Sequence, residues 1–249
     1  MAFFDQHGFK TRFEWGPTGA RELAETSDVI IVVDVISSTT CITIGCERGA
    51  EIYPYRFKDS SAEEYARSLG ATLAVHREAV DEAHPYSLSP GTFMNAKPGE
   101  KIVLPSPNGA TIALAVADAG KPLLAGCLRN ASAVAAAARA LGETVTVIAA
   151  GERWFTADDT LRPAFEDQVG GGAILSHLDR RSPEAESAVA VFEAARDRLL
   201  AMMMDSSSGR EVSERAYEED VRLAAELNIS RTVALFDDAA FVRLSKQDA

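Results

Sequence analysis

The chain has 249 residues, of which 47% are hydrophobic and 25% are charged, and its formal net charge is −12. This is the composition of an ordinary globular protein, and its acidity argues against nucleic acid, a polyanion, as the main partner. A small anionic substrate is still allowed, because a few arginines, lysines or a metal ion are enough to hold one.

The three cysteines, Cys41, Cys46 and Cys127, form no CxxC pair. They suit buried, reduced thiols rather than a disulfide framework. Residues 1–15 are too polar for a signal peptide, and the apolar runs are too short to span a bilayer. We therefore expect a cytoplasmic protein with no membrane contact.

The first strong signal in the chain is residues 29–40, where five apolar residues precede Asp34 and a run of hydroxyl residues. The apolar run predicts a strand over residues 28–34 that is buried on both faces. A helix should begin in the hydroxyl run and end near Gly49, although its Thr and Ile content weakens the helix signal. An ordinary Ser/Thr helix cap would explain the same pattern without a ligand.

The same unit of strand, polar loop and helix recurs downstream. Further strands are predicted at residues 101–104, 123–126 and 145–150, and their helices end at Gly120, at Gly142 after a cap at Asn130, and near Leu178. Overlapping capping boxes that start at Ser60 and Ser61 predict a helix up to Leu69. Residues 77–98 indicate irregular structure, residues 183–228 indicate helices with a break at 205–209, and a short apolar segment follows at 232–236.

Strands that alternate with helices predict an α/β fold. We expect three layers, α/β/α, with a mixed, mainly parallel sheet and a helical C-terminal part. Residues 1–249 would form either a single domain or two interlocked lobes of about 1–125 and 126–249.

Polar residues follow each predicted strand, and in open α/β sheets ligands bind beyond the carboxyl ends of the strands. Asp34, Asn108, Asn130 and Gly151 should therefore lie near one edge of the sheet. A carboxylate such as that of Asp34 suits a hard cation. The hydroxyl and N–H groups of a second set suit an anionic oxygen: Ser37, Ser38, Thr39 and Thr40.

Two further loops offer groups that a phosphate site needs. Ser106, Asn108 and Gly109 provide an amide and a tight turn whose backbone can approach an anion. Arg129 and Arg153 provide bidentate guanidinium groups at the mouths of the next two loops.

Glu166 and Asp167 are adjacent acids at the start of a predicted helix and are followed by Gly170, Gly171 and Gly172. Acids in a first helical turn are often structural. Three glycines inside a helix cost about 1 kcal/mol each, which indicates either close backbone packing or the approach of a ligand. Two or three carboxylates would suit Mg²⁺, which takes few protein ligands.

Several common sites are not indicated. The four histidines lack metal-ligand spacing, and no GxSxG, P-loop or GxGxxG motif is present.

These motifs, in this order, resemble the 2-phosphosulfolactate phosphatase family, also called the ComB family. The resemblance covers about residues 29–241. The residues that carry it are 34–40, 107–111, 130–131, 150–151, 166–167 with the following glycines, 207–211, Tyr217 and Asp220.

The resemblance implies a Mg²⁺-dependent phosphatase that hydrolyses 2-phospho-3-sulfolactate to sulfolactate and phosphate, a step of coenzyme M biosynthesis in methanogens. It implies metal binding by Asp34 with Glu166 and Asp167 as acidic partners. Asn108, Gly109 and residues 38–40 would hold phosphate or sulfonate oxygens.

The chain departs from the family pattern at two places. The family usually has Asp-Val-x-Arg-Ala-Thr-Thr, and Ser37 stands here at the arginine. It also usually has Gly-Glu-Arg and then a Gly-Asn-Ser-Pro-like turn, where this chain reads His-Arg-Glu at 76–78 and Ser-Leu-Ser-Pro at 87–90. A substrate with phosphate, sulfonate and carboxylate groups needs several cations, which Arg77, Arg129 or Arg153 could supply.

Two hypotheses follow. The first is a cytoplasmic Mg²⁺-dependent phosphohydrolase that acts on a small phosphorylated organic acid, with Asp34, Asn108 and Glu166 as catalytic residues. Its nucleophile is either metal-activated water or Asp34 itself, which lacks a DxDx context. The second is a catalytically impaired relative that binds a small anion as a sensor or scaffold. A symmetric homodimer is the default assembly.

Overall fold

The centre of the protein is a nine-stranded sheet with the order β1-β7-β2-β6-β10-β11-β3-β5-β4. The structure is a computed structural model that describes residues 3–57, 59–154 and 160–245. The strands are β1 Thr11–Trp15, β2 Val29–Val33, β3 Glu51–Tyr55, β4 Thr72–Leu73, β5 Lys101–Pro105, β6 Leu123–Gly126, β7 Val145–Ala149, β10 Ala234–Asp237 and β11 Ala240–Arg243. Strands β8 Glu152–Arg153 and β9 Leu161–Arg162 form a separate small ribbon.

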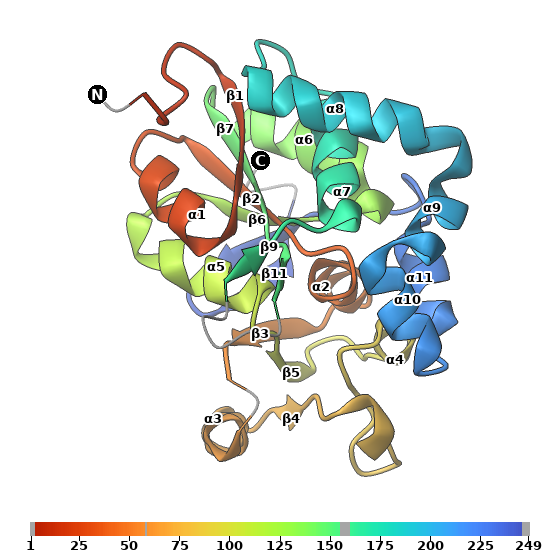
Figure 1. Ribbon diagram of the computed structural model, residues 1–249. Coiled ribbons are helices and arrows are strands. Elements are labelled where there is room, and N and C mark those ends of the chain that lie inside the picture. The colour runs from red at the N-terminus through yellow and green to blue at the C-terminus, as the bar shows by residue number, and fades with distance from the viewer. Residues whose placement is uncertain (1–2, 58, 155–159, 246–249) are drawn as a thin grey trace.

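Helices cover both faces of the sheet (Figure 1). They are α1 Gly16–Ala24, α2 Ser38–Glu47, α3 Ser60–Leu69, α4 Pro90–Phe93, α5 Gly109–Val116, α6 Ala131–Leu141, α7 Phe165–Leu175, α8 Pro183–Ala195, α9 Leu199–Asp205, α10 Ser207–Glu214 and α11 Glu218–Ala224. The α/β fold with a mixed, mainly parallel sheet is confirmed. None of the helices in the described ranges has the length and apolar character needed to cross a membrane.

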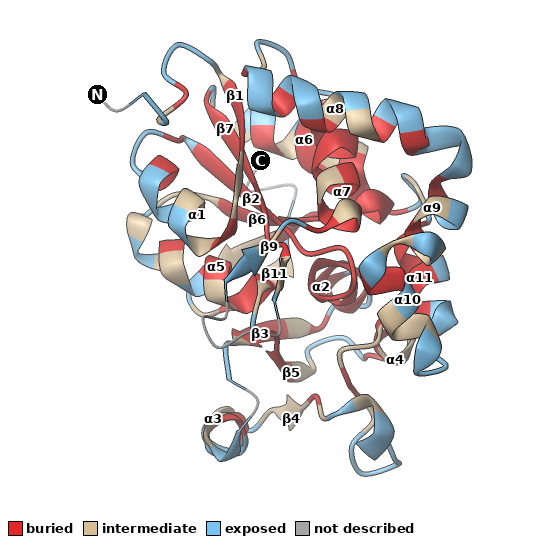
Figure 2. Ribbon diagram, viewed as in Figure 1, coloured by how far each residue is buried: buried red, intermediate tan, exposed pale blue. Residues whose placement is uncertain are grey.

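Strand β2 shows how the layers arise from sequence. Its side chains alternate: Val29, Ile31 and Val33 pack in one core with α6, α7 and α8, whereas Ile30 and Val32 pack in a second core with α1, α2 and α5. All five residues are buried, as the apolar run predicts. Figure 2 shows the same burial running through the sheet and α2.

The sheet consists of two parallel halves. One half is β1-β7-β2-β6 and the other is β3-β5-β4. The hairpin β10-β11 joins them through three antiparallel pairings, so the two halves run in opposite directions. They are not the two halves of the chain, because β1 and β2 pair with strands from residues 123–149.

Two predicted helix caps differ from the structure. Helix α3 is capped by Asp59, whose carboxylate accepts the Ser61 N–H at 3.0 Å, rather than by Ser60 or Ser61. Asn130 does precede α6, but its amide does not cap the helix. It accepts the Cys127 N–H at 2.9 Å and donates to the carbonyl of Thr232 at 3.0 Å, which ties the β6 loop to the segment before β10.

The three glycines of α7 provide close packing, one of the two alternatives that the sequence allows. A Cβ on Gly170 would overlap Val35 of the β2 loop, and one on Gly171 would lie 2.7 Å from Phe13. A Cβ on Gly172 would overlap the backbone carbonyl of Ala188 in α8. The glycines therefore let α7 fit between the sheet and α8.

Candidate active site

A cavity of about 480 Å³, here called the active-site cavity, lies where the loops after β2, β3 and β5 meet β8 and α10. Its charged lining residues, among those that the structure describes, are four arginines and three acids: Arg56, Arg77, Arg153, Arg215, Asp34, Glu152 and Glu211. Of the four strand-end residues that were expected near one edge of the sheet, Asp34 and Asn108 line this cavity, whereas Asn130 and Gly151 do not. Asp34 and Asn108 follow strands from the oppositely directed halves of the sheet, so the cavity lies between these halves and not along one edge.

Asp34 forms the floor of the cavity and joins the two halves. Its Oδ2 accepts hydrogen bonds from the Gly109 N–H at 2.8 Å and the Ser106 hydroxyl at 3.3 Å, and its Oδ1 accepts one from the Ser38 N–H at 3.3 Å. A Cβ on Gly109 would lie 2.7 Å from Asp34 Oδ2, so only glycine fits there. The carboxylate is thus held in place by donors from both β2-α2 and β5-α5.

The hydroxyl run under Asp34 does not face the cavity. Thr39 donates to the carbonyl of Asp34 at 2.8 Å, and Thr40 donates to that of Val35 at 2.7 Å. Ser37 and Ser38 are buried as well, and the lining of the cavity includes none of the four. Because α2 begins inside the core, the Thr39 and Thr40 hydroxyls satisfy their hydrogen bonds with nearby backbone carbonyls. This placement argues against the predicted direct contact with substrate oxygens.

The three predicted arginines have different surroundings. Arg77 donates from Nη2 to the Ser37 hydroxyl at 3.0 Å, so its guanidinium does reach the position of the missing family arginine. Arg153 lies on the cavity wall. Arg129 does not line the cavity; it donates to the Leu223 carbonyl at 3.0 Å and to the carboxylate of Glu226, and so anchors α11.

Asp167 is occupied by backbone groups. Its two carboxylate oxygens accept the Val35 N–H at 2.7 Å and the Gly151 N–H at 2.8 Å, which ties the end of β2 to the end of β7. Burial and the charges of Asp34 and Glu166 raise its pKa well above the ordinary value. The structure therefore favours a structural role for Asp167 over the predicted metal ligation.

Glu166 is buried and lines another cavity, here called the rear cavity, of about 440 Å³; it is not among the lining residues of the active-site cavity. Burial is the main reason that its pKa is raised, and the charge of Asp34 adds to the increase. Its Oε2 and the Ser208 hydroxyl lie close enough for Ser208 to lower the Glu166 pKa, but neither atom makes a hydrogen bond of ordinary geometry with a described residue. An unsatisfied buried carboxylate oxygen is costly, so this pair of oxygens is suited to a cation or a water molecule.

Glu152 is a site residue that the sequence interpretation missed. It lies on the cavity wall and accepts a hydrogen bond from the Asn108 amide at 3.0 Å. Burial, followed by the charges of Asp34 and Glu166, raises its pKa to about 7. Such a group can hold or release a proton at neutral pH. Glu152 lies between Gly151 and Arg153, both of which the sequence places in the loop after a strand, and the same position indicates Glu152.

We expect Glu152→Gln to stabilise the protein at high pH. As pH rises from 4.5 to about 7, the unfolded state loses the Glu152 proton before the folded state does, so wild-type stability falls through this window. Ionising buried Glu152 lowers the free energy of unfolding of the wild type by about 3 kcal/mol at pH 8. The variant lacks this loss, and its amide oxygen can still accept the hydrogen bond from Asn108. Urea unfolding at pH 4 and pH 8, without divalent cations, measures the free energy of unfolding of both proteins. If the variant and the wild type differed by the same amount at both pH values, the difference would not arise from the raised pKa of Glu152.

The fold and the site define an α/β protein whose acidic floor and arginine-lined walls suit a small, multiply anionic substrate. Residues 17–239 match the family model described as 2-phosphosulpholactate phosphatase. The 2-phosphosulfolactate phosphatase of Methanothermobacter thermautotrophicus is 31% identical over 87% of this chain and 90% of its own length. A "Probable 2-phosphosulfolactate phosphatase" of Thermus thermophilus is 30% identical over 83% and 86%, and one of Carboxydothermus hydrogenoformans is 29% identical over 80% and 82%. The chain belongs to the 2-phosphosulfolactate phosphatase family and is therefore a phosphoric monoester hydrolase.

Proposed function

We propose that this chain is a Mg²⁺-dependent phosphatase that hydrolyses 2-phospho-3-sulfolactate to sulfolactate and phosphate. The observation that carries the proposal is the arrangement of four arginines around the Asp34 floor of one cavity. A substrate with phosphate, sulfonate and carboxylate groups requires several cationic contacts, which this cavity offers although Ser37 replaces the family arginine. The names of the relatives agree with this substrate.

We also propose a cytoplasmic location, on the grounds of the free cysteines, and a homodimer, on the grounds of the frequency of two-fold assemblies.

Asp34 and Glu166 are the residues that would hold Mg²⁺. The Glu166 Oε2 and the Ser208 hydroxyl, which make no hydrogen bond of ordinary geometry to a described residue, support this site, and so does the repulsion between the Glu166 and Asp34 carboxylates. Within the described ranges no group of three His, Cys, Asp or Glu side chains is placed to hold a metal. Mg²⁺ keeps several waters and needs only one or two protein carboxylates, so a pair with a hydroxyl fits it. When bound, the ion would neutralise charge on the phosphate.

The other residues position the substrate and carry the proton. Asn108 and Arg153 both line the active-site cavity and would orient the phosphate. Glu152, with a pKa of about 7, would give a proton to the leaving oxygen. Both oxygens of Asp34 already accept hydrogen bonds, which favours water over Asp34 as the nucleophile.

Phosphate release from 2-phospho-3-sulfolactate tests the proposal. We expect turnover with Mg²⁺, its loss in EDTA and its recovery when Mg²⁺ is restored. Turnover that survives chelation would remove the metal from the proposal. No turnover of any phosphorylated hydroxy acid, together with thermal stabilisation by the same compounds, would favour the small-anion-binding alternative.

A further inference from the structure

Arg77 lies between two cavities. The active-site cavity and a second one of about 320 Å³, here called the side cavity, share Arg77, Leu88 and Arg215 among their described lining residues. Asp34, Asn108 and Glu152 line the active-site cavity alone. Arg77 and Arg215 therefore mark one end of the active-site cavity, and the acidic floor with Asn108 marks a different part of it.

The guanidinium of Arg77 is held in a fixed orientation. Its Nε donates to Asp220 at 2.9 Å, its Nη2 donates to Ser37 at 3.0 Å, and its Cζ lies 5.5 Å from the centre of the Tyr217 ring. Asp220 is itself buried and accepts a second hydrogen bond, from Ser89. Arg77 is thus held by two segments of the chain, and Ser89 from a third segment holds Asp220 in turn, so the arginine needs little further ordering when it binds a ligand.

One edge of this guanidinium, at Nη1, remains available to a ligand. Nη1 makes no hydrogen bond to any residue that the structure describes, and the Arg77 side chain keeps 18% of its surface exposed. Arg215, the other arginine at this end, is more exposed and pairs with Glu211 at 3.1 Å. An oxyanion at this end would meet a preorganised double donor and a second positive charge.

We infer that Arg77 binds the second anionic group of the substrate, the sulfonate or carboxylate on the carbon chain, and so selects for substrates that carry one. This assignment rests on the proposed function and adds a direction to it, with the phosphate toward Asp34 and Asn108 and the other anion toward Arg77. The competing explanation is a purely structural arginine that clamps residue 77 to α11. The two explanations differ in whether the effect of a substitution at Arg77 depends on which anionic group the ligand carries.

The affinities of the Arg77→Gln variant for small anions distinguish a substrate-binding Arg77 from a purely structural one. Isothermal titration is done with three probes: sulfolactate, lactate and inorganic phosphate. We expect Arg77→Gln to weaken sulfolactate by about 10-fold or more, the value of a lost hydrogen bond to a charged group, and to change phosphate affinity by less than about 3-fold. If the affinity for lactate falls as much as the affinity for sulfolactate, Arg77 binds the carboxylate. If only the affinity for sulfolactate falls, Arg77 binds the sulfonate.

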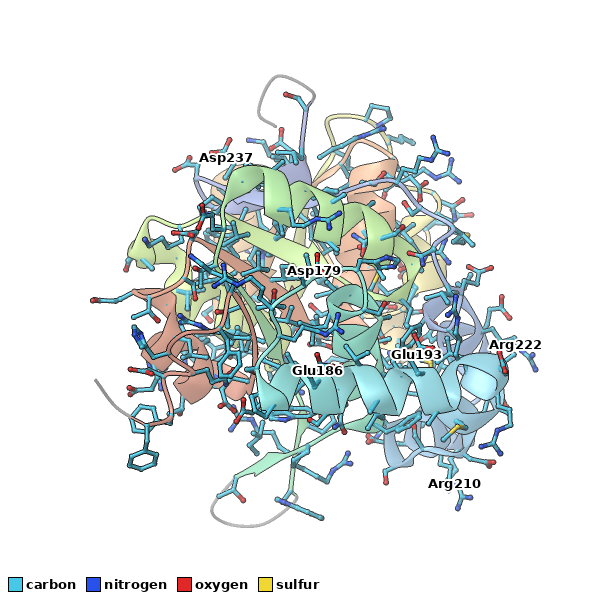
Figure 3. All side chains as sticks on the ribbon, turned by 90° about the horizontal axis from the view of Figure 1, so that it is seen from above. Asp179, Glu186, Glu193, Arg210, Arg222 and Asp237 are labelled. Carbon is cyan, nitrogen blue, oxygen red and sulfur yellow. The ribbon has the colours of Figure 1, made fainter. Side chains whose placement is uncertain are left out.

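Two controls make the result decisive. Arg222→Gln removes an arginine from α11 whose side chain is 58% exposed and points away from the molecule (Figure 3), and it should change no affinity. Arg77→Lys keeps the positive charge and should bind sulfolactate more tightly than Arg77→Gln does. It also provides a second test if Arg77→Gln folds poorly. Equal loss for phosphate and sulfolactate, or no loss for sulfolactate in a folded variant, would overturn the inference. Because these probes require no turnover, failure of the proposed hydrolysis would be seen separately, in the phosphate-release assay.

Discussion

Asp34→Asn is expected to lower kcat/KM for the phosphorylated substrate by a factor on the order of 10³, with little change in stability. The carboxylate is the floor of the cavity, and its charge is what a metal and the phosphate geometry depend on. An amide oxygen can keep the hydrogen bonds from Gly109 and Ser106, so the junction of the two sheet halves survives. The long 3.3 Å bond from the Ser38 N–H is lost, because the amide nitrogen cannot accept it. Phosphate-release kinetics and thermal unfolding measure the two effects.

Asp238→Asn is the matched control. Asp238 is an exposed residue in the β10-β11 turn with φ 56°, a conformation that asparagine also tolerates. It should keep full activity. If Asp34→Asn retained more than a tenth of the wild-type activity, Asp34 would have no place in the mechanism.

Gly172→Ala is expected to destabilise the protein by about 3 kcal/mol, the upper part of the usual range for overpacking. Alanine normally stabilises a helix relative to glycine by about 1 kcal/mol, but here the added carbon would overlap the backbone carbonyl of Ala188. A backbone atom cannot rotate away, so α7 and α8 must separate. Urea unfolding followed by circular dichroism gives the free energy of unfolding.

Gly91→Ala serves as the comparison for this substitution. Gly91 also lies in a helix, and a Cβ there would sit at an ordinary 3.8 Å from Leu223. We expect a change below about 0.5 kcal/mol. If the Gly172 variant were as stable as the wild type, α7 and α8 would not pack as closely at Gly172 as the structure shows.

The parts of the fold that follow from local pattern were predictable. The five apolar residues before Asp34 gave a doubly buried strand, and the glycines after residues 119 and 141 did end their helices. Strands β1 and β3 were not predicted, because Glu14 and Pro54 interrupt their apolar pattern. The insertion of β10 and β11 between the sheet halves could not be predicted, since it depends on pairing across more than 100 residues and no local signal encodes it.

The position of the site was predictable in part, and its contacts less so. Asp34 at the end of β2 and Asn108 after β5 do line the cavity, but the opposite directions of these two strands, which bring the loops together between the sheet halves, did not follow from the element order. Whether a polar group faces a ligand or the backbone is decided by its neighbours in space. Thr39 bonds to the backbone of its own turn, Asp167 bonds to Val35 and Gly151, and Arg129 bonds to α11. Burial, followed by the charges of Asp34 and Glu166, raises the pKa of Glu152, and both the burial and these charges depend on segments brought together by the fold.

A crystal structure of the protein grown with Mn²⁺ and inorganic phosphate tests the central claim most directly. Mn²⁺ takes the same oxygen ligands as Mg²⁺ and can be located by its anomalous scattering. We predict an anomalous peak in contact with Asp34 and Glu166, with phosphate beside it and against Asn108 in the active-site cavity. Phosphate bound only in the side cavity or the rear cavity, with no metal at Asp34 and Glu166, would contradict the assignment of this site.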